Sequence, residues 1–217
     1  MVTWNSTHQV NFDRRGHGMN AKFFDLKQEK QDRMVNAALK IFALNGYQHA
    51  STDDIVREAH ISKGLLFHYF DSKIGVYSFI YDYAIRYISL ELSSAVDPAE
   101  TSFFEVLKQM EAAKMQVLKS YPFMFMFVHS CRSESITEAV LATEAGQKTI
   151  SDNIETILSA TDRSFLETKK NAMDLMKMLS YTVNGTMITA LKDGSFNAEM
   201  NYKESIKYIT LVEKSIK

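Results

Sequence analysis

Apolar side chains recur at helical spacing along most of the chain, and turn-forming residues divide this pattern into separate segments. The pattern predicts helices at about 26–45, at two short stretches within 51–71, and at about 72–93, 99–119, 123–129, 134–158, 163–192 and 198–216. In the first of these, Met34, Ala38 and Ile41 lie on one face, and Gly46 follows at a C-cap position. We therefore predict an all-α fold.

Residues 51–73 carry the signals of two short helices joined by a tight turn. Ser51 can cap the first helix, and Asp54 stands three residues later at the spacing of a capping box. His60 occupies the turn and favours a left-handed backbone more than most non-glycine residues do. Ser62 can cap the second helix. Two helices in this arrangement indicate a DNA-binding helix-turn-helix.

The outward face of the second helix has chemistry suited to a major groove. Lys63 can reach a guanine edge or a phosphate, and Gly64 lets the backbone approach closely. Leu65 can meet a thymine methyl group, Tyr69 can hydrogen-bond to a phosphate, and Lys73 can pair with another phosphate at the next helix start. The alternative is a helical hairpin whose polar face is only solvated. The candidate DNA-contacting residues are Ser51, Thr52, Ser62, Lys63, Gly64, Leu65, Phe67, His68, Tyr69 and Lys73.

The segments STDDIVREAH and SKGLLFHYFDSK resemble the helix-turn-helix of the TetR family of bacterial transcriptional regulators. With the preceding helix, the resemblance covers roughly residues 28–90. Three positions depart from the usual pattern. His60 stands where glycine is usual, and Leu65 and Phe67 replace positions that are often Thr and Tyr. The last two changes remove possible hydroxyl contacts, which puts the operator sequence in doubt but not DNA binding.

The resemblance implies an all-helical homodimer that binds a palindromic operator and is released by a small effector. It implies dimerisation through the last two long helices, at about 163–192 and 198–216. We expect Met187 and Ile209 to lie in that interface. A repressor is the usual member of the family.

The segments group into three parts. Residues 1–24 show no periodicity, and we expect a disordered or leader segment there, with a basic arm through Arg14 and Arg15 as the alternative. Residues 25–72 form the predicted three-helix DNA-binding domain. Residues 73–217 form the predicted helical bundle for effector binding and dimerisation.

The passage FMFMFVH at 123–129 is the most hydrophobic in the chain. Methionine and phenylalanine side chains adapt to irregular neighbours, as at an apolar ligand site, although ordinary core packing is the alternative. Lys114 would favour an anionic ligand unless it extends along the surface. The expected effector contacts are Met110, Lys114, Phe123, Phe127, Met176, Tyr181 and Asn184.

Composition and charge limit the classes of protein to which the chain can belong. Hydrophobic residues make up 46% of the 217 residues, and the net charge of −1 does not by itself indicate a nucleic-acid binder. One cysteine and no apolar run long enough for a membrane span suit a cytoplasmic protein. His129 and Cys131 do not face each other on a helix, the six histidines lack metal-ligand spacing, and no phosphate-binding glycine loop is present. We therefore expect no catalytic residues, no cofactor and no metal. Two alternatives remain: a helix-turn-helix interaction protein without an effector, and a helical-bundle enzyme with an apolar cavity.

Overall fold

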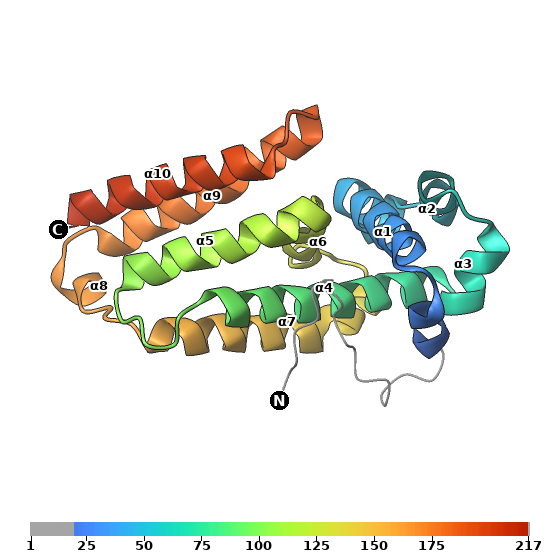
Figure 1. Ribbon diagram of the computed structural model, residues 1–217, viewed down its shortest axis with the longest axis horizontal. Coiled ribbons are helices and arrows are strands. Elements are labelled where there is room, and N and C mark those ends of the chain that lie inside the picture. Colours follow the sequence, from blue (N-terminus) through green and yellow to red (C-terminus); the bar gives the residue numbers. More distant parts are fainter. Residues whose placement is uncertain (1–19, 217) are drawn as a thin grey trace.

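The computed structural model describes residues 20–216, which form an elongated, all-helical molecule (Figure 1). A short 3₁₀ helix, η1 (Asn20–Asp25), comes first. The α-helices are α1 (Gln28–His49), α2 (Thr52–Ala59), α3 (Lys63–Phe70), α4 (Lys73–Ala95), α5 (Phe103–Ser120), α6 (Met124–Cys131), α7 (Thr137–Ser159), α8 (Phe165–Thr168), α9 (Ala172–Asp193) and α10 (Ala198–Ile216). The predicted fold class is confirmed, and α10 has the predicted bounds.

The N-terminal unit consists of α1, α2 and α3 at one end of the molecule, with η1 against α3 (Figure 1). Phe23 of η1 is fully buried, and its ring lies 5.5 Å from that of Phe70 and 5.0 Å from that of Phe79. The expectation of a disordered or leader segment is therefore wrong for residues 20–24, because one aromatic side chain anchors them in the core. Arg14 and Arg15 lie outside the described residues.

The helix α1 is interrupted where the glycine was expected to end it. Gly46 has φ of 66° and ψ of 176°, which breaks the helical conformation before the last residues of α1. Glycine adopts positive φ without the penalty that a Cβ atom imposes on other residues. The predicted end of the first helix thus coincides with a kink at Gly46, after which the helical assignment continues to His49.

The long helix α4 leaves the N-terminal unit and runs through the rest of the molecule, with α7 alongside it and α5 on another side (Figure 1). The predicted buried helix at FMFMFVH is α6, which packs against α1. Phe127 is fully buried, with its ring 5.4 Å from Tyr77 and 6.0 Å from Phe42. An aromatic cluster therefore joins α1, α4 and α6 into one core.

Two predicted helices differ from the observed ones. The helix expected from residue 99 begins at Phe103, because Asp97 and Pro98 instead form a turn in which Asp97 Oδ1 accepts a hydrogen bond from Ala99 N. The single helix expected at 163–192 is divided into α8 and α9. Asn171 breaks it with φ of 67°, a left-handed conformation that asparagine tolerates.

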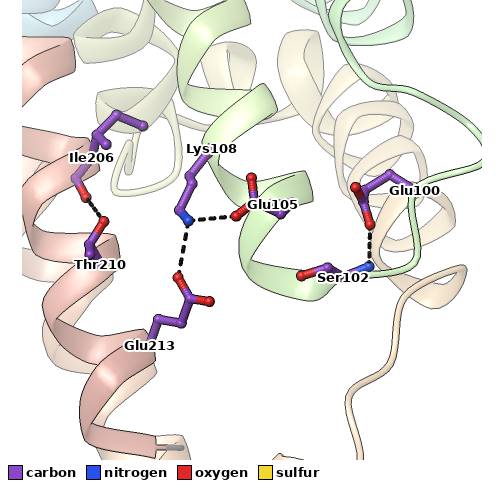
Figure 2. A network of polar contacts seen from close by, with 7 residues as sticks. All are labelled: Glu100, Ser102, Glu105, Lys108, Ile206, Thr210 and Glu213. Carbon is purple, nitrogen blue, oxygen red and sulfur yellow. Dashed lines mark hydrogen bonds and ion pairs between the residues drawn. The ribbon is translucent and has the colours of Figure 1, made fainter.

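The last helix packs along α5, and a polar network ties the two together (Figure 2). Lys108 Nζ on α5 lies 2.6 Å from Glu105 Oε1 and 3.0 Å from Glu213 Oε2 of α10. Because the side chains of Lys108 and Glu213 are both partly buried, their ion pair is more persistent than one between fully solvated charges. It holds the C-terminal end of α10 against the helix that carries Val106 and Leu107.

Met187 and Ile209, which we expected in the dimer interface, are instead buried within the protomer. Met187 belongs to the main core, and Ile209 belongs to a second apolar cluster among α5, α9 and α10. The helical periodicity was predicted correctly, but periodicity alone does not distinguish apolar positions that face the core of the protomer from those that face solvent. The large apolar side chains that do lie exposed on α9 and α10 are Met173, Met178, Tyr181, Met200 and Leu211.

Candidate nucleic-acid interface

Local capping shapes the helix-turn-helix. Ser51 Oγ accepts a 3.1 Å hydrogen bond from Asp53 N, and Ser62 Oγ accepts a 3.2 Å bond from Leu65 N. These bonds satisfy amide groups that the first turn of a helix leaves without partners. His60 takes the predicted left-handed conformation, with φ of 52° and ψ of 50°. The carboxylate of Asp54, expected in a capping box, pairs with Arg57 instead.

The solvent-facing surface of α3 contains most of the expected contacts, with one correction. Lys63, Gly64 and His68 are exposed, and Leu65 and Phe67 are half-buried. Tyr69 is only 7% exposed, because its ring packs against Phe23 of η1 at a centroid distance of 6.0 Å. The prediction that Tyr69 belongs to the exposed face is therefore wrong, and the residue that covers it lies in the segment expected to be disordered.

Gly64 lies on the exposed surface of α3. No atom lies within 4 Å of the position that a Cβ would occupy there. Internal packing therefore does not require a glycine, although glycine within a helix costs about 1 kcal/mol relative to alanine.

The two lysines of the candidate interface are bound to the protein in different ways. Lys63 Nζ lies 2.8 Å from Asp53 Oδ1, and both side chains are largely exposed. A solvated pair of this kind is weak, so a phosphate can replace the carboxylate. Lys73 Nζ donates to Gln48 O at 3.2 Å and lies 4.7 Å from the centre of the Tyr47 ring. Burial lowers the pKa of Lys73, against the effect of the nearby Glu138 and Glu134.

Tyr47 joins this corner of the interface to the start of α7. Its hydroxyl donates a 2.6 Å hydrogen bond to Glu138 Oε1, and its backbone N–H donates a 3.0 Å bond to Glu134 Oε2. Partial burial opposes ionisation of Glu134, but N–H groups of Ile136, Tyr47 and Ser135 outweigh it and lower the pKa. We call Tyr47, Lys73, Glu134 and Glu138 the junction cluster.

A second set of polar contacts holds the opposite end of α1. Tyr121 donates to Asp32 Oδ1 at 2.8 Å, and its hydroxyl lies 2.6 Å from that of Tyr83. Asn36 Nδ2 donates to Ser120 O at 3.1 Å. The C-terminal bundle thus contacts α1 near both ends, so the DNA-facing unit is not attached through α4 alone.

Comparison with known proteins agrees with this geometry. Residues 34–77, from α1 into α4, match the family model of bacterial regulatory proteins, tetR family. The helix-turn-helix region of this chain is thus similar to that of tetR-family regulators. YuxN of Bacillus subtilis, an uncharacterised helix-turn-helix transcriptional regulator, is 30% identical over 103 residues. That match covers 46% of this chain and 34% of YuxN, so it spans about a third of the relative's length.

Solved TetR-family structures share the fold over most of the chain. PfmR from Thermus thermophilus has a TM-score of 0.53 and 21% identity, with coverage of 83% of this chain and 96% of PfmR. A TetR-family regulator from Agrobacterium tumefaciens has a TM-score of 0.57 and 17% identity, with coverage of 86% and 97%. These likenesses establish the TetR-like arrangement of helices beyond the helix-turn-helix.

The expected effector contacts do not form one site in the structure. Met110, Met176 and Asn184 line a small cavity of about 180 Å³ among α5, α9 and α10. Phe127 is part of the aromatic core, and Tyr181 is 69% exposed on α9. The remaining two lie elsewhere: Lys114 is buried, 3.5 Å from Glu111 Oε1 and over the Phe125 ring, and Phe123 is half-buried against the main core.

A larger cavity, of about 800 Å³, lies among the C-terminal halves of α4 and α7 and the start of α5. Its buried apolar walls include Ile85, Leu92 and Val106. Ser89 and Asn153 are half-buried on its walls, and Asn153 Nδ2 donates to Ser89 Oγ at 2.9 Å. Sequence reasoning missed this cavity because its walls come from segments far apart in the chain. The Ser and Asn within apolar helix stripes were the available signal.

The described helices also bear on membrane and metal chemistry. No helix within residues 20–216 is long and apolar enough to cross a membrane. Within the same residues, no three His, Cys, Asp or Glu side chains are grouped so that they could hold a metal ion. Cys131 is buried, where desolvation raises its pKa to about 12, and it accepts a 3.1 Å hydrogen bond from Tyr77.

Proposed function

We propose that this TetR-family transcriptional regulator is a dimeric repressor, which binds a palindromic DNA operator and is released by a small, largely apolar effector. The carrying observation is the exposed N-terminal turn of α3, where Lys63 and Gly64 lie beside the Ser62 cap. In helix-turn-helix proteins, the N-terminal residues of the second helix contact base edges in the major groove.

Selection of bound sequences from random DNA, followed by fluorescence anisotropy at several salt concentrations, tests DNA binding. Lys63→Ala should lower the slope of log affinity against log salt by about 1, since one phosphate contact releases about one counterion. Lys148→Ala on α7 is the matched control and should leave the slope unchanged. Protein that selects no sequence, or a slope that Lys63→Ala leaves intact, contradicts the proposed interface.

Dimerisation is proposed through α9 and α10. The exposed Met178 and Tyr181 of α9 lie on the same helix as the small Gly185, whose Cβ position has no atom within 4 Å. Apolar side chains beside small ones favour close packing of a second helix pair. An obligate interface of this kind buries upwards of about 2,000 Å² in total.

The larger cavity is the proposed effector site, in place of the residues expected from sequence. It lies on the C-terminal halves of α4 and α7, whereas the junction cluster lies at the N-terminal ends of these helices. The two helices pack against each other along their length (Figure 1). A ligand that separates them at one end can thereby bias the junction with α1 at the other.

The coupling between effector binding and DNA release that this proposal requires is modest. Release of DNA by one to two powers of ten needs a coupling free energy of about 1.4–2.8 kcal/mol. A reporter under the selected operator distinguishes repression from activation, because deletion of a repressor raises expression. A protein without operator affinity that turns over a ligand bound in the cavity would instead support the enzyme alternative.

A further inference from the structure

The polar groups around the larger cavity differ in whether they remain available to a ligand. Three hydroxyl groups on its wall donate to carbonyls of their own helices: Ser93 to Leu90 at 2.9 Å, Thr149 to Ala145 at 3.0 Å and Thr156 to Asp152 at 2.8 Å. A hydroxyl has one hydrogen to donate. These three side chains therefore offer a ligand only acceptor lone pairs.

Three ionisable side chains on the cavity wall, those of Arg86, Asp97 and Glu100, already interact within the protein. Asp97 Oδ1 accepts from Ala99 N at 2.9 Å. Glu100 Oε1 accepts from Ser102 N at 2.7 Å (Figure 2). Both carboxylates thus cap the turn between α4 and α5. Arg86 is exposed and already interacts with other groups of the protein. Burial of a charged ligand group in this cavity would cost hydration, and the two carboxylates on its wall are already used in the turn.

The pair Ser89–Asn153 is the half-buried neutral polar feature of the wall. Its single internal hydrogen bond uses one donor and one acceptor of the pair. Whichever way the amide is turned, the pair keeps at least one N–H or O–H donor and at least one oxygen acceptor for a ligand. A carboxylate can only accept and an ammonium can only donate, whereas a hydroxyl or a carboxamide can do both.

We infer that the cavity takes an uncharged, mostly hydrocarbon molecule whose single hydroxyl or amide group binds between Ser89 and Asn153. This inference rests on the proposed function, since it names the effector class for the proposed effector site. The volume of about 800 Å³ falls within the range of drug-sized ligand pockets. Ile85, Leu92 and Val106 contact the hydrocarbon part, and the pair on α4 and α7 orients the polar end.

Four probes of equal chain length test the ligand class: decanol, decanamide, decanoate and decylammonium. Calorimetric titration into the full-length protein at neutral pH should show that decanol and decanamide bind at least about tenfold more tightly than the two ions. Asn153→Leu should remove this preference while apolar binding persists. Gln147→Leu, which removes another amide paired with a hydroxyl on α7 at 3.0 Å, should keep it.

Several outcomes would overturn the inference. Equal or tighter binding of decanoate would contradict the uncharged class, and loss of the preference in Asn184→Leu would place the ligand in the smaller cavity. If Asn153→Leu does not fold, Ser89→Ala is used instead. A preference for the uncharged probes that Ser89→Ala leaves unchanged would also contradict the inference. Operator affinity is measured on the same preparations. Protein that binds DNA but no probe refutes this inference alone, and protein that binds the probes but no DNA refutes the proposed function.

Discussion

The hydroxyl of Tyr47, at the end of α1, donates a 2.6 Å hydrogen bond to the carboxylate of Glu138, at the start of α7. Burial, and then this hydrogen bond, raise the pKa of the Tyr47 phenol. The same ring packs under the ammonium group of Lys73, a candidate phosphate contact on α4. Tyr47 belongs to α1 of the DNA-facing unit, and its side chain contacts α4 and α7, two of the helices that line the larger cavity.

Tyr47→Phe should weaken this junction without changing the packing of the ring. We expect a loss of about 1–2 kcal/mol in the free energy of unfolding, because a partly buried charge-assisted hydrogen bond is lost. Urea denaturation followed by circular dichroism measures it. Tyr208→Phe is the matched control: it removes a hydroxyl whose bond to Glu204 lies in solvent, so its loss should be smaller. Equal losses would show that the junction has no special contribution.

Glu134→Gln tests the electrostatics of the same junction. Because the pKa of Glu134 is lowered in the folded protein, its carboxylate stabilises the fold above the ordinary value of 4.5, and this contribution disappears as pH falls through the folded pKa. Wild type should therefore be more stable than the variant at pH 7, and the difference should shrink below pH 4.5. Denaturation midpoints measured from neutral to acidic pH show this trend. Glu144→Gln, on the exposed side of α7, is the matched control, and an equal pH-dependent difference in that variant would contradict the contribution of the junction.

Gly64→Ala should separate folding from DNA binding. The free protein should gain about 0.5–1 kcal/mol, because alanine favours the helix and the added methyl group meets open space. Affinity for the selected operator should fall, since the same methyl group stands where the DNA backbone approaches. Thermal unfolding and anisotropy measure the two effects. Lys148→Ala, on the exposed side of α7, is the control and should leave operator affinity intact. Unchanged affinity in Gly64→Ala would remove α3 from the interface.

Tyr181→Glu should prevent dimerisation. A carboxylate in the centre of an apolar interface loses its hydration without a partner, which costs several kcal/mol. Sedimentation velocity at low micromolar concentration should show monomers, and operator binding should be lost with them. Leu141→Glu is the matched control, since Leu141 on α7 is 66% exposed and Tyr181 is 69% exposed. A dimer that survives Tyr181→Glu but not Leu141→Glu would move the interface to α7.

Much of the DNA-facing unit was predictable because its signals are short-range. Ser62 caps α3, His60 makes the left-handed turn, and Gly46 ends the regular part of α1, as the sequence indicates. Each of these depends on a few neighbouring residues and the backbone conformations that they favour. The same local signals were insufficient at Asn171, where a residue that permits a left-handed turn does not require one.

The sequence by itself determined the helical class and the helix-turn-helix, because periodicity, caps and breakers act within a few residues of each other. Tertiary structure decided which faces of those helices are buried. It placed Phe23 over Tyr69, put Phe127 in an aromatic core and left Tyr181 in solvent. It also assembled the larger cavity from Ser89 and Asn153, which lie 64 positions apart. Side chains with the same apolar character can fill a core, line a cavity or lie exposed on the surface. Only the packing of distant segments distinguishes these outcomes.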